Sequence, residues 1–208
     1  MSIGIALSPF AIDATDNAAD AAVALGREAV DVGLSSLWFG QLFTHDTIGL
    51  AGIVGRQVRH SRSPPNWPTA QCLSWSAPRR SPSTSSRPSP PPPKKPAALA
   101  PRIVAMVPGV VTADIDTARA AATEQMAFYN EIPSYKRMIE LSGASHAAEL
   151  AVIGDEQTLA DQITAYFEAG ATDVVVAQTD LSTEADRQRT WQVLGDLNHT
   201  SSAATPQR

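Results

Sequence analysis

The 208 residues suffice for one domain with a substantial core, and their composition excludes several classes of protein. The formal net charge of −5 argues against nucleic-acid binding, and the single cysteine, Cys72, excludes an internal disulfide framework and fits a reducing cytoplasm. The N-terminus has no signal-peptide pattern, and no apolar run approaches the ~20 residues that cross a bilayer. We therefore expect a soluble, cytoplasmic protein that binds neither nucleic acid nor membrane.

Residues 1–55 predict two βα units. A short apolar run bounded by Ser-Pro indicates a buried strand, and a helix with one apolar face follows it and ends at Gly33. A second strand and the start of a second helix come next. The predicted ranges are Ile3–Leu7 (strand), Asn17–Val32 (helix), Leu34–Phe39 (strand) and Asp46–Val54 (helix). Strands that alternate with helices in this way indicate a parallel sheet.

Residues 56–101 differ from everything around them. They hold 12 of the 16 prolines and 8 of the 16 Lys and Arg, with no Gly, Asp or Glu, so the flanking pieces together carry about −13. Three interpretations stay open: coding sequence translated out of frame after a deletion, a Pro-rich linker that forms polyproline II around Pro90–Pro93 and could offer a PxxP-type ligand, or a basic arm for an acidic partner. The first also accounts for the isolated Trp and Cys. In each case we expect disorder, because no periodic apolar residues offset the ordering entropy.

Residues 102–195 return to the alternation of strands and helices. The predicted strands are Ile103–Val107, ended by Pro108-Gly109, and Asp173–Ala177; Leu150–Ile153 is a short apolar run closed by Gly154-Asp155. The predicted helices are Ile115–Tyr129, capped by Thr112 or Asp114, then Tyr135–Leu141, Glu156–Glu168 and a polar helix from about Ser182. Residues 196–208 are Ser- and Thr-rich, and we expect a disordered tail there.

Four motifs in this order carry a resemblance to a known family. IGIALSPF and AVDVGLSSLWFGQLFTHDTIGLAGIVGRQV resemble the first two units of the luciferase-like monooxygenase superfamily, in its coenzyme F-420-dependent oxidoreductase branch. RIVAMVPGVVT with the IPSYKRMIELSG stretch resembles the seventh unit, and VIGDEQTLADQITAYFEAGATDVVVAQT resembles the eighth. The resemblance spans Ile3–Gln57 and Arg102–Trp191.

The resemblance implies an incomplete (β/α)8 TIM barrel. Such barrels need about 250 residues, and here the insert stands where units three to six belong. Because a closed barrel brings strand eight beside strand one, we expect a four-stranded parallel sheet in the order 7-8-1-2 with helices on one face. The former barrel interior and the edges of strands two and seven would then be open, which would favour aggregation or a homodimer.

The resemblance also implies an activity: hydride transfer between reduced F-420, or FMN, and a small organic substrate, impaired by the missing units. The alternatives are a non-enzymatic α/β interaction module whose Pro-rich loop binds a partner, and an inactive degenerate product. Active sites of parallel barrels lie at the carboxyl ends of the strands. That criterion selects seven residues after the predicted strands: Ser8, Phe10, Gln41, His45, Pro108, Val110 and Gln178. The candidate cofactor contacts among them are Ser8, Gln41, His45 and Gln178.

Two of these candidates, Gln41 and His45, have an alternative role. By resemblance Gln41 faces the deazaflavin ring, where it could hydrogen-bond but not titrate; it could equally be an ordinary loop residue. His45 could be a helix-entry residue before an Asp46 N-cap. We expect Tyr129 and Tyr135 to pack beneath the barrel rim rather than act on substrate. No spacing among the four histidines suggests a metal site, and no catalytic residue is assigned.

Overall fold

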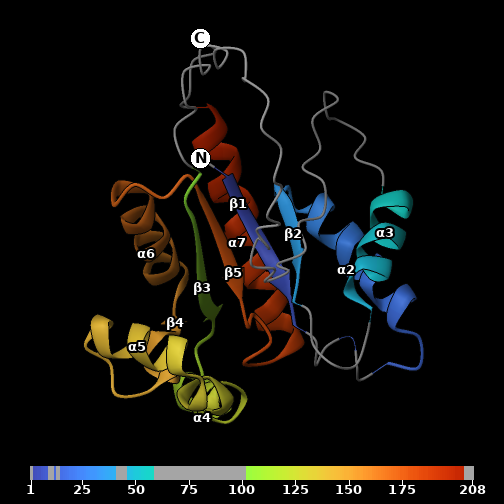
Figure 1. Cartoon of the computed structure of the whole chain (residues 1–208). Helices are drawn as coiled ribbons and strands as arrows, with labels where there is room; N and C mark the ends of the chain where they lie inside the picture. Colours follow the sequence, from blue (N-terminus) through green and yellow to red (C-terminus); the bar gives the residue numbers. More distant parts are fainter. Residues whose placement is uncertain (1, 9–11, 13–14, 41–45, 59–101, 204–208) are drawn as a thin grey trace, which may run out of the picture.

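A computed structural model describes residues 2–8, 12, 15–40, 46–58 and 102–203 (Figure 1). Most of the Pro-rich insert lies outside these residues, as do Gln41 and His45. The exceptions at the start of the insert are Arg56 and Gln57, which form the last two residues of a helix, α3, and Val58, which caps it. The folded N-terminal piece therefore extends slightly further than the composition predicted.

The centre of the fold is an all-parallel sheet of five strands in the order β2-β1-β5-β3-β4. Its strands are β1 (Ser2–Leu7), β2 (Ser36–Phe39), β3 (Val104–Val111), β4 (Val152–Gly154) and β5 (Asp173–Ala177). The four predicted strands lie in the predicted order, so the last strand, β5, pairs with the first, β1. The predicted strand count is wrong, because the short β4 adds a fifth strand beside β3.

β3 is longer than the sequence predicted, because Pro108 does not end it. The amide hydrogens of Thr172 and Asp173 both bond to the carbonyl of Ile103, so the main-chain groups of odd-numbered residues face β5. Pro108, an even-numbered residue, therefore directs its nitrogen away from β5, where a missing N–H costs the ladder nothing. The strand continues to Val111, and its last residues pair with β4.

The helices begin at the polar caps that the sequence offers. Their ranges are α2 (Ala18–Asp31), α3 (Thr47–Gln57), α4 (Ile115–Gln125), α5 (Pro133–Ser142), α6 (Glu156–Glu168) and α7 (Glu184–Ala203), with short 3-10 turns η1 (Ala127–Glu131) and η2 (Ala147–Leu150). The side chains of Asn17, Asp46, Asp114 and Asp155 accept hydrogen bonds from the first turns of α2, α3, α4 and α6. Asp46 is thus the predicted N-cap.

The main core lies between one face of the sheet and four helices: α2, α3, α6 and α7 (Figure 1). Alternate strand residues enter it, among them Ile3 and Ile5 of β1 and Val174 and Val176 of β5, all at most 1 % exposed. The prediction of helices on one face is confirmed for these four helices. β5, in the middle of the sheet, is an uninterrupted apolar run because all of its residues except Asp173 are apolar and all are buried, whereas Val104 and Met106 of β3 stay exposed.

α4 and α5 do not join that layer. They lie beyond the carboxyl ends of the strands, near the end of β3 (Figure 1). A second, smaller core holds them there, and it includes Val110 of β3, Ala118 and Ala122 of α4, Ile139 of α5 and Leu181 after β5. The carboxyl edge of the sheet is therefore partly covered by the helical segment that follows β3.

The predicted disordered tail is wrong over its first part, because α7 continues to Ala203. Asn198 explains the order there. Its Oδ1 accepts from the Ile3 amide at 3.0 Å and from the Ser35 hydroxyl at 2.8 Å, and its Nδ2 donates to the Gly33 carbonyl at 2.9 Å. The Ser- and Thr-rich composition of this segment gave no sign that Asn198 would be buried and hydrogen-bonded.

Within the part of the chain described, no helix combines the length and the apolar character that crossing a membrane requires.

Candidate functional site

The carboxyl edge of the sheet is where the sequence placed the candidate site. Ser8 follows β1 and Gln178 follows β5, and these two strands are neighbours, so the structure brings both residues to the same edge. Each is partly buried. The other two candidates, Gln41 and His45, fall outside the described residues, so their positions stay predictions.

Gln178 has an uncommon backbone conformation. Its φ is 46°, and it is the one non-glycine residue with positive φ in the described part of the chain. A side chain in the left-handed region costs about 1 kcal/mol relative to glycine. Such strained positions cluster at functional sites, where the surrounding structure holds a side chain in a set direction. The positive φ therefore makes Gln178 a candidate functional residue at the carboxyl edge.

The Gln178 side chain meets Tyr129 of η1. Burial raises the pKa of the Tyr129 phenol, the neighbouring Tyr135 raises it further, and a hydrogen bond with Gln178 offsets part of the rise. The two tyrosine rings lie with their centroids 4.8 Å apart and a 46° tilt. The phenol thus stays protonated at neutral pH and is able to donate a hydrogen bond.

The segment α4–η1–α5 positions these tyrosines. Asp114 starts α4 directly after β3, and Pro133 stands at the first turn of α5, where its missing N–H leaves no bond unmade. Asn130 secures the turn, since its Oδ1 accepts from the Ala147 amide at 2.8 Å. Tyr129 was not selected from the sequence; the available signal was that its helical segment begins at the carboxyl end of a predicted strand.

Two further polar atoms in this region lack partners. Oε1 of Gln125, the last residue of α4, and Oδ1 of Asp180, two residues after Gln178, are buried without a hydrogen bond. Buried polar atoms are almost always paired, so unpaired ones are candidate contacts for a ligand. Among the described residues, no group of three or more His, Cys, Asp or Glu could hold a metal ion.

A cluster of hydroxyls around Asp186 ties the start of α7 to the end of β3. Its Oδ2 accepts from Ser182 at 2.7 Å, from Thr183 at 3.0 Å and from Thr112 at 3.0 Å. The Ser182 bond is the largest of the effects that lower the Asp186 pKa. The lowered pKa makes the Asp186 carboxylate a weak base, and its three hydrogen bonds fix the β5–α7 connection.

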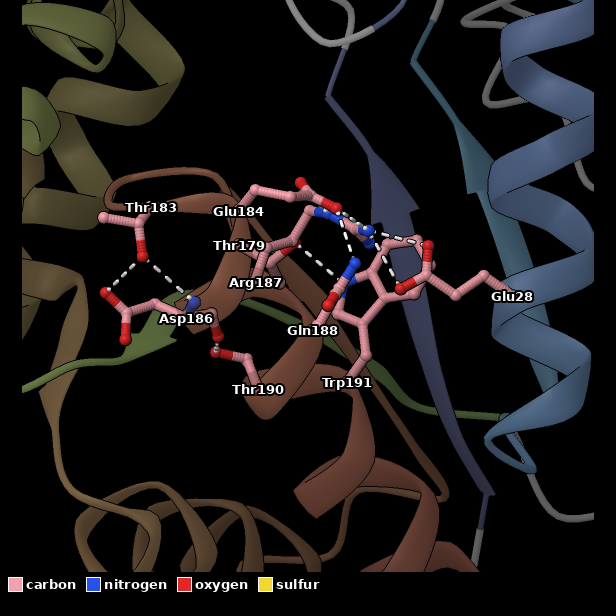
Figure 2. Close-up of polar contacts among 9 residues, drawn as sticks. All are labelled: Glu28, Thr179, Thr183, Glu184, Asp186, Arg187, Gln188, Thr190 and Trp191. Carbon is pink, nitrogen blue, oxygen red and sulfur yellow. Dashed lines mark hydrogen bonds and ion pairs between the residues drawn. The ribbon is translucent and has the colours of Figure 1, made fainter.

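Beside this cluster lies a buried arginine, Arg187 (Figure 2). Its Nη2 donates to both carboxylate oxygens of Glu28 on α2, at 2.8 and 2.6 Å, and to Glu184 at 2.6 Å. The guanidinium also lies 4.2 Å from the ring centre of Trp191, whose indole N–H donates to Thr179. This cluster joins the N-terminal piece of the chain to the C-terminal piece.

The side chains at the carboxyl edge are suited to hydrogen-bonding a ligand rather than to proton transfer. Gln178 offers a donor and an acceptor, Tyr129 offers a neutral donor, and Ser8 offers a hydroxyl.

Comparisons of the chain with protein-family models, with curated proteins and with solved structures gave no match.

Proposed function

We propose that the chain is a shortened member of the luciferase-like oxidoreductases, a barrel fragment whose carboxyl edge binds the ring of coenzyme F-420 or of FMN. The order of the strands carries the proposal. β1 and β2 come from one end of the sequence and β3 and β5 from the other, yet they form one sheet in which β5 lies beside β1. A barrel brings its last strand beside its first, so this order is expected of a barrel fragment.

The residues at the carboxyl edge fit the ring of such a cofactor. A flat heteroaromatic ring presents carbonyl and N–H groups along its edge, and the Gln178 amide can pair with either kind. The buried, unpaired Oε1 of Gln125 can accept from a ring N–H. Tyr129 and Tyr135 add aromatic surface beside these polar groups.

In this proposal the protein orients the cofactor ring and shields it partly from water. The bound deazaflavin or flavin supplies hydride transfer to a small organic substrate. Gln178 directs its amide because its strained backbone allows few alternatives. Tyr129 stays neutral and donates a hydrogen bond. Since half of the barrel is absent from the sequence, we expect weak binding and low or no turnover.

The test is an equilibrium titration of the purified chain with F-420 and, separately, with FMN, followed by absorbance. We expect saturable binding of one of them. Gln178→Ala should weaken it about two- to tenfold, as expected for the loss of one hydrogen bond. Gln162→Ala, on the exposed side of α6, is the matched control and should bind like the wild type. The absence of saturable binding of either cofactor would contradict the proposal.

A further inference from the structure

Among the described residues, the outer edge of β3 is paired only at its carboxyl end, with β4. β4 pairs only with Gly109–Val111, so within the described residues no strand lies beside the stretch from Val104 to Pro108 on that side. The carbonyl of Ile103 faces β5, and the alternation of a strand then directs the main-chain N–H and C=O groups of Val104 and Met106 outward. These are donors and acceptors that a further strand could use.

The side chains at this edge are apolar and exposed. Ile103 is 51 %, Val104 36 % and Met106 48 % exposed. The nearest charge is already paired, because Arg102 binds both oxygens of Asp173 at 2.8 Å. The edge strands of natural β-sheets usually carry an unpaired lysine, a bulge or a proline that prevents pairing with a strand of another molecule. Here only Pro108, at one end of the stretch, does so.

The opposite edge of the sheet does not offer the same surface. β2 spans only Ser36–Phe39, and its large side chains Trp38 and Phe39 are 6 % and 5 % exposed. The indole N–H of Trp38 donates to the Ser36 hydroxyl at 3.0 Å. The edge of β3 is therefore the place where main-chain groups and exposed apolar side chains coincide.

We propose that a second copy of this chain pairs with the first along β3, antiparallel, about a two-fold axis beside Ala105. In this register Val104 lies opposite Met106 of the second copy, and the two residues exchange main-chain hydrogen bonds on both sides of the axis. Their side chains then cover one another on the same face of the joined sheet. The contact is isologous and closes at two copies, so it does not propagate into a fibre.

The size of this contact sets its strength. A standard interface buries ~800 Å² per partner. One short ladder and three partly exposed side chains per copy offer less, and Arg102 brings no repulsion because Asp173 compensates its charge. The dimer is therefore weak and reversible, and it dissociates on dilution.

Sedimentation velocity over a concentration series tests the interface. The wild type should shift from monomer to dimer as concentration rises, while Met106→Lys should weaken the dimer at least tenfold, because it places like charges beside the axis. Met138→Lys is the matched control: Met138 is 65 % exposed on α5, and this variant should behave like the wild type. Circular dichroism checks that both variants fold. A wild type that stays monomeric at every concentration, or a Met106→Lys variant that still dimerises, would overturn the proposal.

A disulfide tests the register. Directly opposed residues of a non-hydrogen-bonded antiparallel pair have Cα atoms ~4.5 Å apart, within the ~4.4–6.8 Å range of disulfides. Ala105→Cys in a Cys72→Ala background should therefore form a covalent dimer on mild oxidation. Leu141→Cys in the same background, at a position 77 % exposed on α5, should not. Dimerisation without the Ala105→Cys cross-link would refute the proposed pairing.

Discussion

Replacing Arg187 by alanine should destabilise the protein strongly, because this one side chain joins α7 to α2. The guanidinium is 6 % exposed, binds Glu28 through both carboxylate oxygens, and also binds Glu184. Trp191 packs against it with 4.2 Å between the guanidinium carbon and the ring centre. The substitution removes the charge-assisted hydrogen bonds and the stem that packs on the indole.

The size of the loss in stability depends on how exposed the carboxylates of Glu28 and Glu184 are once the arginine is gone. Removing one partner of a buried ion pair typically costs 3–5 kcal/mol, about 4 in mid-range, because the other charge stays buried and unpaired. Here the carboxylates of Glu28 and Glu184 are 28 % and 65 % exposed, so water can hydrate them once the arginine is gone. We therefore expect the lower end, about 3 kcal/mol, which corresponds to a fall in Tm of about 6–12 °C for a chain of this size.

Urea denaturation followed by circular dichroism measures this difference. Arg189→Ala is the matched control on the same helix: Arg189 pairs with Glu156 at the surface, where both side chains are more than two-fifths exposed, so the loss should stay below about 1 kcal/mol. If Arg187→Ala lost no more free energy of unfolding than Arg189→Ala, the assigned role of the buried cluster would be refuted.

Substitutions of Gln178 and Asn198, and a pH series on Arg102→Met, test other parts of the structure. Gln178→Gly and Gln178→Ala both remove the amide, but only glycine relaxes the positive φ, so the glycine variant should be more stable by about 1 kcal/mol in urea; equal stabilities would contradict the strain. Asn198→Ala leaves the Ile3 amide unpaired and should cost about 1–3 kcal/mol in the same assay; an unchanged midpoint would refute the account of α7's ordered end. Arg102 lowers the pKa of Asp173 below its ordinary 3.8, so this carboxylate stabilises the fold above that pH and the stabilisation is lost as the pH falls through the lowered value. Unfolding measured between about pH 5 and pH 2 should therefore show a smaller loss for Arg102→Met than for the wild type.

Apolar runs and capping residues predicted most elements of the sheet and its helices. α6 and β5 begin and end where the pattern placed them, because Asp155 caps the helix and an Ala-Gly turn separates it from a fully buried strand. The position of β5 beside β1 was predictable only through the resemblance to a cyclic barrel. Local sequence carries no information on which distant strand pairs with which.

The errors have physical causes that the sequence does not display. β4 has three residues, Val152–Gly154, too few for a period to show, and it pairs with β3 only because β3 continues past Pro108 to Val111. The order at the end of α7 depends on one buried amide, Asn198, that bonds residues far away in the sequence. In the candidate site, Gln178 was predicted from its place after a strand, whereas its contact with Tyr129 arises from the folding of α4 and η1 over the carboxyl edge.

The proposed function depends on one structural feature, that the two ends of the sequence form a single sheet with β1 beside β5. Nuclear Overhauser effects between backbone protons test it directly in solution. We predict contacts of Ile3 and Ile5 with Val174 and Val176, and of Met106 with Val175, in the parallel register. Contacts of β1 with β3 instead, or no contact between the N-terminal and C-terminal strands, would contradict the barrel order and with it the proposed function.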